Sequence, residues 1–256
     1  MLFDLTGKTA IVTGSSRGIG LAIATRLAEA GARVVISSRK APACEAAAAG
    51  INARYGAGRA IAVPANISSK DNLKALVEQT LGQLGRLDIL VCNAASNPYF
   101  GPMSGIGDDA FRKILENNIV ANNWLIQLAL PALERQGGGS IVIISSIGGL
   151  QGSAGIGAYN ISKAADMQLA RNLAVELGPK QIRVNCIAPG LVRTDFARAL
   201  WENPETLAHY TKAAPLGRIG EPDDIAGCAV FLASPASAFL TGQTIVVDGG
   251  VTIAGV

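Results

Sequence analysis

The chain has very little histidine, no strong charge imbalance and no clustered cysteines. Its single histidine, His209, excludes a histidine-cluster metal site and argues against a Ser-His-Asp hydrolase. The net charge is only +3 without a run of basic residues, so nothing points to nucleic acid as a partner. The four cysteines lie far apart and lack metal-site spacing. We therefore expect neither a bound metal nor a nucleic-acid partner.

Long apolar runs are also missing. No run reaches the roughly 20 residues that span a bilayer, so we expect no membrane partner. The first ten residues do not form a signal-peptide pattern, and the separated cysteines indicate free thiols in a reducing compartment. These features lead us to expect a cytoplasmic protein.

The chain is rich in glycine and alanine, and short apolar runs alternate with helical patterns along it. This alternation predicts an α/β fold: a Rossmann-type, doubly wound, parallel seven-stranded sheet with helices on both faces, in a single domain over residues 1–256. Strands are expected at 9–13, 33–37, 59–63, 87–91, 140–145, 182–187 and 243–247. Helices are expected at 18–30, 41–54, 69–83, 108–136, 158–178 and 222–233.

One stretch, 191–220, interrupts the alternation. It contains large apolar side chains and two prolines, Pro204 and Pro215, and we expect it to form a lid insertion over a substrate site. An ordinary surface insertion is the alternative.

A glycine loop follows the first apolar run. Its glycines are Gly14, Gly18 and Gly20, and a helical pattern begins directly after them. Glycines let a backbone approach a pyrophosphate, and a helix N-terminus offers N–H donors and a positive dipole to it. The spacing Gly-x-x-x-Gly-x-Gly differs from the standard dinucleotide fingerprint, and a lone glycine loop can also be a tight turn.

A second motif lies beyond the middle of the chain. Tyr159 and Lys163 are four residues apart in a helical pattern and so share one face, with Ser146 thirteen residues upstream. A nearby ammonium favours the phenolate and lowers a pKa that is roughly 10 in free tyrosine. Such a tyrosine can exchange a proton with an alcohol. Alone, Tyr-x-x-x-Lys is commonly a surface turn, so the glycine loop is what supports a functional interpretation.

Together the two motifs resemble the classical short-chain dehydrogenase/reductase family over essentially the whole chain. Further family marks follow in order: Asn93-Ala94, Asn118, Pro189-Gly190 and Asp248-Gly249-Gly250. Cys92 and Ala95 depart from the family's pattern around Asn93. The resemblance implies an oxidoreductase that passes hydride between a nicotinamide and a ketone or secondary alcohol without a metal. It also implies four catalytic residues, with Tyr159 as proton donor or acceptor: Asn118, Ser146, Tyr159 and Lys163.

The end of the predicted strand 33–37 indicates the cofactor. An NAD enzyme usually has a carboxylate there, whereas this chain has Ser38 and then Arg39, whose guanidinium can bind a 2′-phosphate. Arg17 adds a positive charge nearby, so we predict NADP(H) in preference to NAD(H). The family resemblance places the cofactor contacts at Gly14, Ser16, Arg17, Gly18, Ile19, Gly20, Ser38, Arg39, Asn66, Ile67, Asn93, Ala94, Tyr159, Lys163, Pro189, Gly190, Val192 and Thr194.

The substrate, a small-molecule carbonyl or alcohol, is the least defined feature. The expected pocket is mostly apolar and is formed by Ser146, Leu150, Ile156, Tyr159, Leu191, Phe196 and Trp201. The segments 92–101 and 38–40 look closest to the tetrameric NADPH-dependent carbonyl reductases of this family, which implies a homotetramer. The apolar faces of 108–136 and 158–178 agree with that assembly.

Two alternatives remain open. One is a 3-oxoacyl-(acyl-carrier-protein) reductase, whose carrier-docking arginines would fall at Pro131 and Val175, neither of which is basic. The other is a dinucleotide-sensing scaffold without turnover. Turnover of NADPH across a panel of ketones and a 3-oxoacyl thioester would distinguish all three.

Overall fold

A parallel sheet forms the centre of the molecule. The computed structural model describes residues 1–254, so the last two residues of the predicted domain lie outside the described part. The strands are β1 (Thr9–Thr13), β2 (Arg33–Ser37), β3 (Ala60–Ala62), β4 (Ile89–Cys92), β5 (Gly139–Ile144), β6 (Ile182–Pro189) and β7 (Thr244–Val247). Their order is β3-β2-β1-β4-β5-β6-β7, and every neighbouring pair is parallel. The predicted seven-stranded, doubly wound α/β fold is confirmed.

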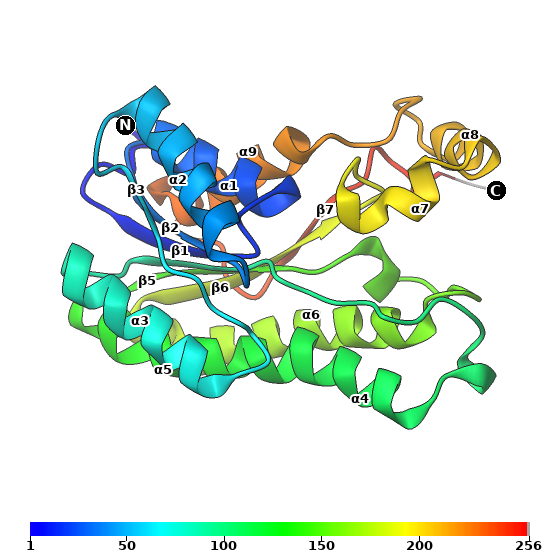
Figure 1. The fold of residues 1–256 in the computed structure, drawn as a ribbon, viewed down its shortest axis with the longest axis horizontal. Helices are drawn as coiled ribbons and strands as arrows, with labels where there is room; N and C mark the ends of the chain where they lie inside the picture. Colours follow the sequence, from blue (N-terminus) through cyan, green and yellow to red (C-terminus); the bar gives the residue numbers. More distant parts are fainter. Residues whose placement is uncertain (255–256) are drawn as a thin grey trace.

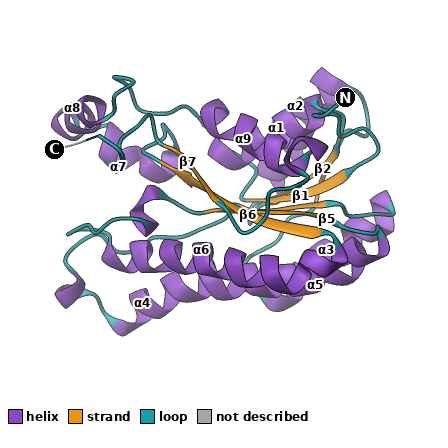
Figure 2. Cartoon of the chain, turned by 180° about the vertical axis from the view of Figure 1, so that it is seen from behind, coloured by secondary structure: helices purple, strands orange, loops and turns teal. Residues whose placement is uncertain are grey.

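Helices cover both faces of the sheet, as Figures 1 and 2 show. One layer contains α1 (Gly18–Glu29), α2 (Ala41–Tyr55) and α9 (Pro222–Ala233); the other contains α3 (Lys70–Leu84), α4 (Asp108–Leu115), α5 (Ala121–Arg135) and α6 (Gly157–Leu177). Successive strand residues point to opposite faces, so Ile11 packs in one core and its neighbours Ala10 and Val12 pack in the other. This explains why consecutive residues in the middle of a strand such as β1 are apolar.

Local sequence signals mark where several of these helices begin or end. The Ser69 side chain caps α3 by accepting from the Asn72 N–H, and Gly85 ends that helix in the left-handed conformation. At α9, Glu221 and Asp224 form a reciprocal capping box. The bounds of these two helices lie within one or two residues of those that the periodicity predicted.

The predicted helix 108–136 is wrong as a single α-helix. The structure has α4, then a π-helical turn η2 (Glu116–Val120), then α5. A π turn contains an extra residue and leaves no mark in a 3.6-residue pattern.

The segment 191–220 contains short helices of its own: η5 (Asp195–Ala197), α7 (Arg198–Trp201) and α8 (Pro204–Ala213). In Figure 1, α7 and α8 lie at the end of the molecule near the C-terminus. They stand apart from the two helical layers, which agrees with an insertion.

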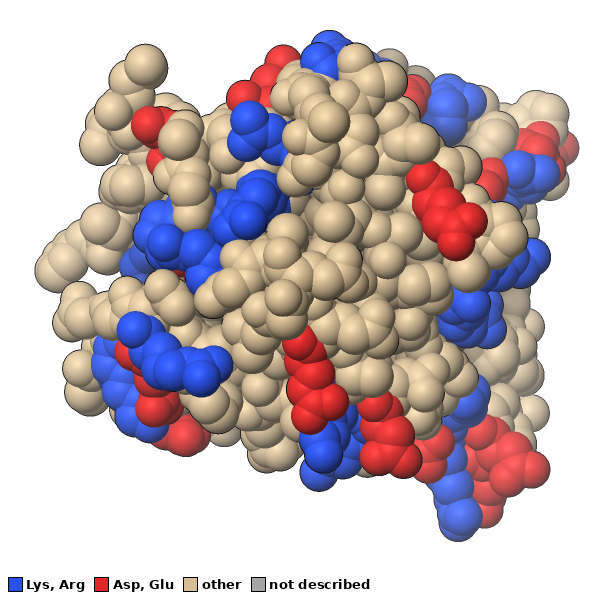
Figure 3. Space-filling model, turned by 60° about the vertical axis from the view of Figure 1, so that its left-hand side comes forward, with Lys and Arg blue, Asp and Glu red and all other residues tan. Residues whose placement is uncertain are grey.

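The surface carries mixed charge. On the face in Figure 3, Lys and Arg are mostly interspersed with Asp and Glu, and broad uncharged areas separate them. Over residues 1–254, every helix is too short or too polar to cross a membrane.

Candidate active site

The motifs meet at one edge of the sheet because they follow parallel strands. The glycine loop follows β1, Asn93 follows β4, Ser146 lies two residues beyond β5, and Gly190 directly follows β6. The carboxyl ends of these strands share one edge, which is where ligands bind in open α/β sheets.

The glycine loop is tied to β4. Gly14 and Gly18 have φ values of 64° and 58°, the left-handed region that favours glycine. The Asn93 side-chain amide donates to the carbonyl oxygens of Thr13 at 2.8 Å and of Gly14 at 3.2 Å. Gly20 packs so closely that a Cβ atom would lie 2.5 Å from the Asn93 amide nitrogen. The loop is therefore held in a shape that only glycines allow.

The start of α1 fits the phosphates of a dinucleotide. Its N-cap residue, Arg17, makes no side-chain cap, and the first turn contains no acidic residue. The N–H groups at this end thus have no side-chain acceptor from the cap, and the helix dipole favours an anion. Arg17 itself donates to Asp195 of the 191–220 segment at 2.9 Å. This bond uses one of the five guanidinium N–H donors of Arg17, so the other donors can serve a phosphate.

The other expected cofactor residues border the same edge. The Ala94 N–H donates to the Thr13 hydroxyl at 3.1 Å, and Thr194 lies against Gly18. Arg39 is exposed just beyond β2. Ser16 and Ile19 lie in the loop and first turn; Ser38, Asn66 and Ile67 follow β2 and β3; Pro189, Gly190 and Val192 end β6 or follow it. The structure therefore places the whole expected set along one edge.

Tyr159, Lys163 and Ser146 come together at this edge. The Lys163 ammonium lies 5.6 Å from the centre of the Tyr159 ring. The Ser146 hydroxyl accepts from the Gly148 N–H at 3.0 Å. Burial raises the pKa of Tyr159, and a hydrogen bond between the phenol and Ser146 opposes that rise. From η5, the Phe196 ring lies 6.0 Å from the Tyr159 ring, so the inserted segment reaches the proposed proton donor.

The expected lowering of the Tyr159 pKa is wrong for this structure. Burial raises the pKa of Tyr159 above its usual value; the Lys163 charge opposes that rise and the Asp166 charge adds to it. The sequence-based expectation considered the cation alone. It omitted both the loss of water around the phenol and a carboxylate on the same helix.

Asp166 is the main site residue that the sequence analysis missed. Its carboxylate accepts from the Lys163 ammonium at 3.0 Å, and the same ammonium donates to the Ile144 carbonyl at 2.8 Å. A signal was present: Tyr159, Lys163 and Asp166 are spaced i, i+4 and i+7, which puts all three on one helix face.

Asn118 lies in the η2 turn and is fully buried. Its amide group donates to the Ser162 hydroxyl at 3.0 Å and to the Ser96 carbonyl at 3.1 Å, while its side-chain oxygen accepts from the Ser96 N–H at 2.8 Å. Both amide hydrogens are thus used by the protein. A water bound at Asn118 can be held only through its oxygen atoms.

The expected pocket residues do not all gather around Tyr159. Phe196 lies beside it, and Leu150 is half exposed in the segment after Ser146. Ile156 directly precedes α6 and is partly buried. The Trp201 indole instead donates to the Thr194 carbonyl at 2.7 Å, with Arg193 over its ring. Trp201 therefore packs on its own segment in this structure.

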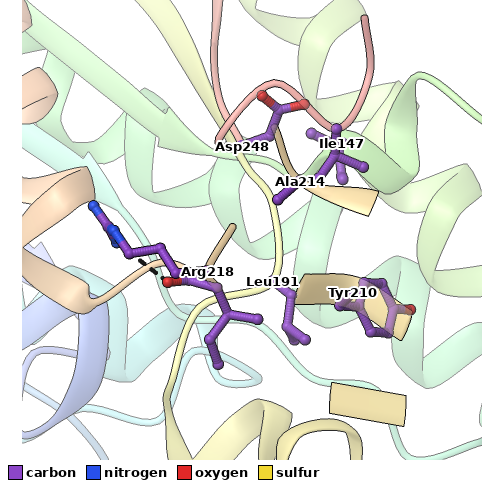
Figure 4. Close-up of a pocket in the computed structure, with 8 residues that line it drawn as sticks. Ile147, Leu191, Tyr210, Ala214, Arg218 and Asp248 are labelled. Carbon is purple, nitrogen blue, oxygen red and sulfur yellow. Dashed lines mark hydrogen bonds between the residues drawn. The ribbon is translucent and has the colours of Figure 1, made fainter. Parts of the chain in front are cut away.

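Leu191 lines a small cavity of about 10 Å³ between the inserted segment and the residues Ile147, Asp248 and Val251 (Figure 4). Tyr210 of α8, which the sequence analysis did not single out, lines it as well. A neighbouring cavity of about 140 Å³ is also lined by Leu191. The walls of the first are Ile147, Leu191, Tyr210, Ala214, Arg218, Ile219, Asp248 and Val251.

Comparisons with known proteins identify the family. A family model described as Enoyl-(Acyl carrier protein) reductase matches residues 14–252. Dehydrogenase/reductase SDR family member 4 of Oryctolagus cuniculus is 42% identical over 247 residues, which cover 96% of this chain and 94% of that protein. The chain belongs to the short-chain dehydrogenase/reductase family.

Solved structures of similar proteins hold nicotinamide cofactors. A 7α-hydroxysteroid dehydrogenase complexed with NADH and 7-oxo glycochenodeoxycholic acid is 39% identical, with a TM-score of 0.92 and coverage of 97% of this chain and 95% of that one. A gluconate 5-dehydrogenase from Burkholderia cenocepacia J2315, in complex with NADP and tartrate, is 31% identical, with a TM-score of 0.94 and coverage of 99% and 98%. This short-chain dehydrogenase/reductase is an oxidoreductase of a nicotinamide-dependent family.

The described residues of this short-chain dehydrogenase/reductase offer no cluster of three His, Cys, Asp or Glu side chains for a metal ion. The two relatives differ in both cofactor and substrate. The preference of this chain therefore depends on its own residues.

Proposed function

We propose that this protein is an NADP(H)-dependent carbonyl reductase that interconverts a ketone and a secondary alcohol. The convergence of Ser146, Tyr159 and Lys163 beside the glycine loop is the observation that carries the proposal. Bound NADPH supplies the hydride. The residues of the chain supply the proton, the polarisation of the carbonyl oxygen and the binding of the cofactor.

Tyr159 donates the proton to the carbonyl oxygen. Its raised pKa keeps the phenol protonated at neutral pH, which suits the reductive direction. Ser146 donates a hydrogen bond to the same oxygen as negative charge develops there. Lys163 stabilises the tyrosinate that remains and holds the nicotinamide ribose, and an oxygen of Asn118 holds a water that returns the proton. Tyr159→Phe tests this assignment directly.

The preference for NADP(H) rests on the end of β2. Ser38 stands where an NAD enzyme usually has a carboxylate, and the exposed Arg39 and Lys40 follow it. We expect a higher kcat/KM with NADPH than with NADH, and we expect Ser38→Asp with Arg39→Ile to invert the order. Arg135→Ile removes one exposed positive charge elsewhere and serves as the control. A wild type that favours NADH would contradict the role of Arg39.

The substrate we propose is an apolar ketone. Phe196 packs beside Tyr159, and the half-exposed Leu150 and the exposed Phe100 come from the two segments next to it. Phe100 contacts the Gly155 backbone just before α6, so these apolar groups surround the start of that helix. An apolar rim of this kind favours a ketone with an apolar body.

Reduction of a 3-oxoacyl thioester is a second candidate, because the matching family model is described as Enoyl-(Acyl carrier protein) reductase, which names a carrier-bound acyl substrate although not a ketone. Pro131 and Val175 are exposed, but neither offers a positive charge to a carrier protein. NADPH oxidation should be measured across simple ketones, bulky ketones and a 3-oxoacyl thioester. Preference for the thioester over every ketone would replace the first proposal.

The segment 191–220 is proposed as a lid over the substrate site. Phe196 already contacts the Tyr159 ring, and Arg17 of the glycine loop pairs with Asp195. The lid thus joins the cofactor loop to the proton donor, and its closure would exclude water from the reaction.

The proposed assembly is a homotetramer in the cytoplasm. Val120, Ile161 and Val175 are exposed apolar residues of η2 and α6; Val246 is exposed in the edge strand β7, and Phe239 is exposed shortly before that strand. Such surfaces are suited to symmetric contacts between copies of the chain. Light scattering at micromolar concentration should give about four times 26.2 kDa. A mass near one chain would contradict this assembly.

A further inference from the structure

A fully buried carboxylate lies directly behind the proposed proton donor. Asp166 has no exposed surface. One of its oxygens accepts from Lys163 at 3.0 Å, and the other accepts from the side-chain amide of Asn122 on α5, also at 3.0 Å. Removing a carboxylate from water is unfavourable unless its charge is paired and hydrogen-bonded. Both oxygens of Asp166 meet that condition.

This arrangement fixes the Lys163 ammonium. An ammonium has three N–H donors, of which the Ile144 carbonyl and the Asp166 carboxylate take two. One donor remains for the cofactor or the tyrosine. Lys163 is itself almost completely buried, so its position depends on these two partners.

We propose that Asp166 is a positioning residue that holds the Lys163 ammonium in place and keeps both protons on the Tyr159–Lys163 pair. It touches neither substrate nor cofactor and acts through Lys163. The inference rests on the proposed function, in which Tyr159 transfers the proton.

The charges around Asp166 support this role. Tyr159 and Lys163 face it from α6 itself, Asn122 from α5, Cys92 from β4 and Cys186 from β6. Burial raises the pKa of Cys186 to about 12 and also raises that of Cys92, so both thiols stay neutral near pH 7. The charges that act on the phenol are therefore those of Lys163, which favours the tyrosinate, and of Asp166, which favours the protonated phenol.

The direction of the effect follows from electrostatics alone. Burial lowers the pKa of Lys163, but the Asp166 charge raises it above its usual value, and the same charge raises the pKa of Tyr159. Removing one negative charge makes the protonated pair less stable. The pair then loses its first proton at lower pH, whichever of the two groups releases it.

The test is the pH dependence of ketone reduction in Asp166→Asn, which keeps the shape of the side chain. Reduction needs protons on both Tyr159 and Lys163, so its kcat/KM falls at alkaline pH. We expect this alkaline limb to move down by about one pH unit or more in the variant. At pH values above both limbs the variant should be at least about tenfold slower, and at low pH the difference should shrink. Glu176→Gln removes an exposed carboxylate from the same helix and should keep the wild-type profile.

A second variant acts on Asp166 from another helix. Asn122→Ala removes an N–H donor that shares the charge of the carboxylate, so this charge acts more strongly on Lys163 and the alkaline limb should move slightly to higher pH, opposite to its shift in Asp166→Asn. Circular dichroism confirms that each variant is folded. A uniform loss of rate with an unmoved limb in Asp166→Asn, or an unchanged profile in that variant, would overturn the inference. Wild-type turnover in the same assay establishes the oxidoreductase separately, so such a result counts against Asp166 alone.

Discussion

Replacing Gly20 by alanine should damage the cofactor loop, although alanine favours helices. Gly20 is the third residue of α1 and is buried. A Cβ atom there would press on the Gly14 carbonyl and lie 2.5 Å from the Asn93 amide nitrogen. These two groups form the hydrogen bond that ties the loop to β4. Because the Gly14 contact is with backbone, the loop itself has to shift.

The magnitude follows from three contributions. Overpacking costs about 1–3 kcal/mol, and the hydrogen bond between Asn93 and Gly14 contributes about 1 kcal/mol that is lost. Alanine is about 1 kcal/mol more favourable than glycine inside a helix, and this gain offsets part of the destabilisation. The net destabilisation is about 1–3 kcal/mol, which for a domain of this size lowers Tm by about 2–12 °C.

Gly82→Ala is the matched control. Gly82 lies inside α3, and a Cβ atom there meets nothing within 4 Å. This change should stabilise the fold by up to about 1 kcal/mol. Thermal unfolding and NADPH titration by fluorescence should be measured for both variants. We expect Gly20→Ala to raise the Kd for NADPH by at least about tenfold, roughly 1.4 kcal/mol, and Gly82→Ala to leave it unchanged.

The reasoning fails if Gly20→Ala melts at or above the wild-type temperature and binds NADPH as Gly82→Ala does. Such a result would mean that the loop relaxes without cost around an added methyl group. The close approach would then be irrelevant to cofactor binding.

Three further predictions concern other parts of the molecule. Tyr159→Phe should keep the fold and NADPH binding but lose at least about 10²-fold in kcat, and near-normal turnover would end the proton-donor assignment. Trp201→Ala removes the indole that donates to Thr194, and KM should rise more for bulky ketones than for small ones; equal rises would make Trp201 an ordinary packing residue. Burial raises the pKa of Asp88, but hydrogen bonds from Arg86 and from the Thr9 N–H lower it below its usual value of 3.8. The charged Asp88 therefore stabilises the fold fully above pH 3.8, and this stabilisation is lost as the pH falls through the folded-state pKa. Asp88→Asn should therefore cost about 1.5–3 kcal/mol at neutral pH and flatten the acid dependence of Tm, and a change that is equal at every pH would refute the sign.

Much of the fold, and the meeting of Ser146, Tyr159 and Lys163 at one edge of the sheet, could be predicted from the sequence. Strand and helix periods alternate clearly, and parallel strands bring their carboxyl ends to one edge. Tyr159 and Lys163 lie on a regular helix, so their shared face follows from their spacing alone. The position of Ser146 follows because a strand ends just before it.

The environment of these residues could not be predicted in the same way. Asp166 stands in an alanine-rich helix, where an aspartate normally indicates the exposed face. Its spacing places it on the helix face of Tyr159 and Lys163, but only the packing of α6 against α5 and β6 shows that this carboxylate is buried. Within the segment 191–220, no periodic pattern in the sequence indicates that Phe196 contacts Tyr159 while Trp201 bonds to Thr194. The three-dimensional contacts alone decide both cases.

The π-helical turn η2 sets the rotational phase of the helix that follows it. An α-helix advances about 100° per residue, and one extra residue in a turn offsets the faces of α4 and α5 by about that angle. With this offset, Asn118 bonds to Ser162 while Asn122 bonds to Asp166, so two successive turns dock on α6. Deleting one residue from Glu116–Val120 would restore a regular helix and rotate α5 about the helix axis relative to α4. Such a deletion would therefore change which side chains face α6 along the whole of α5, instead of disturbing only the residues next to the deletion.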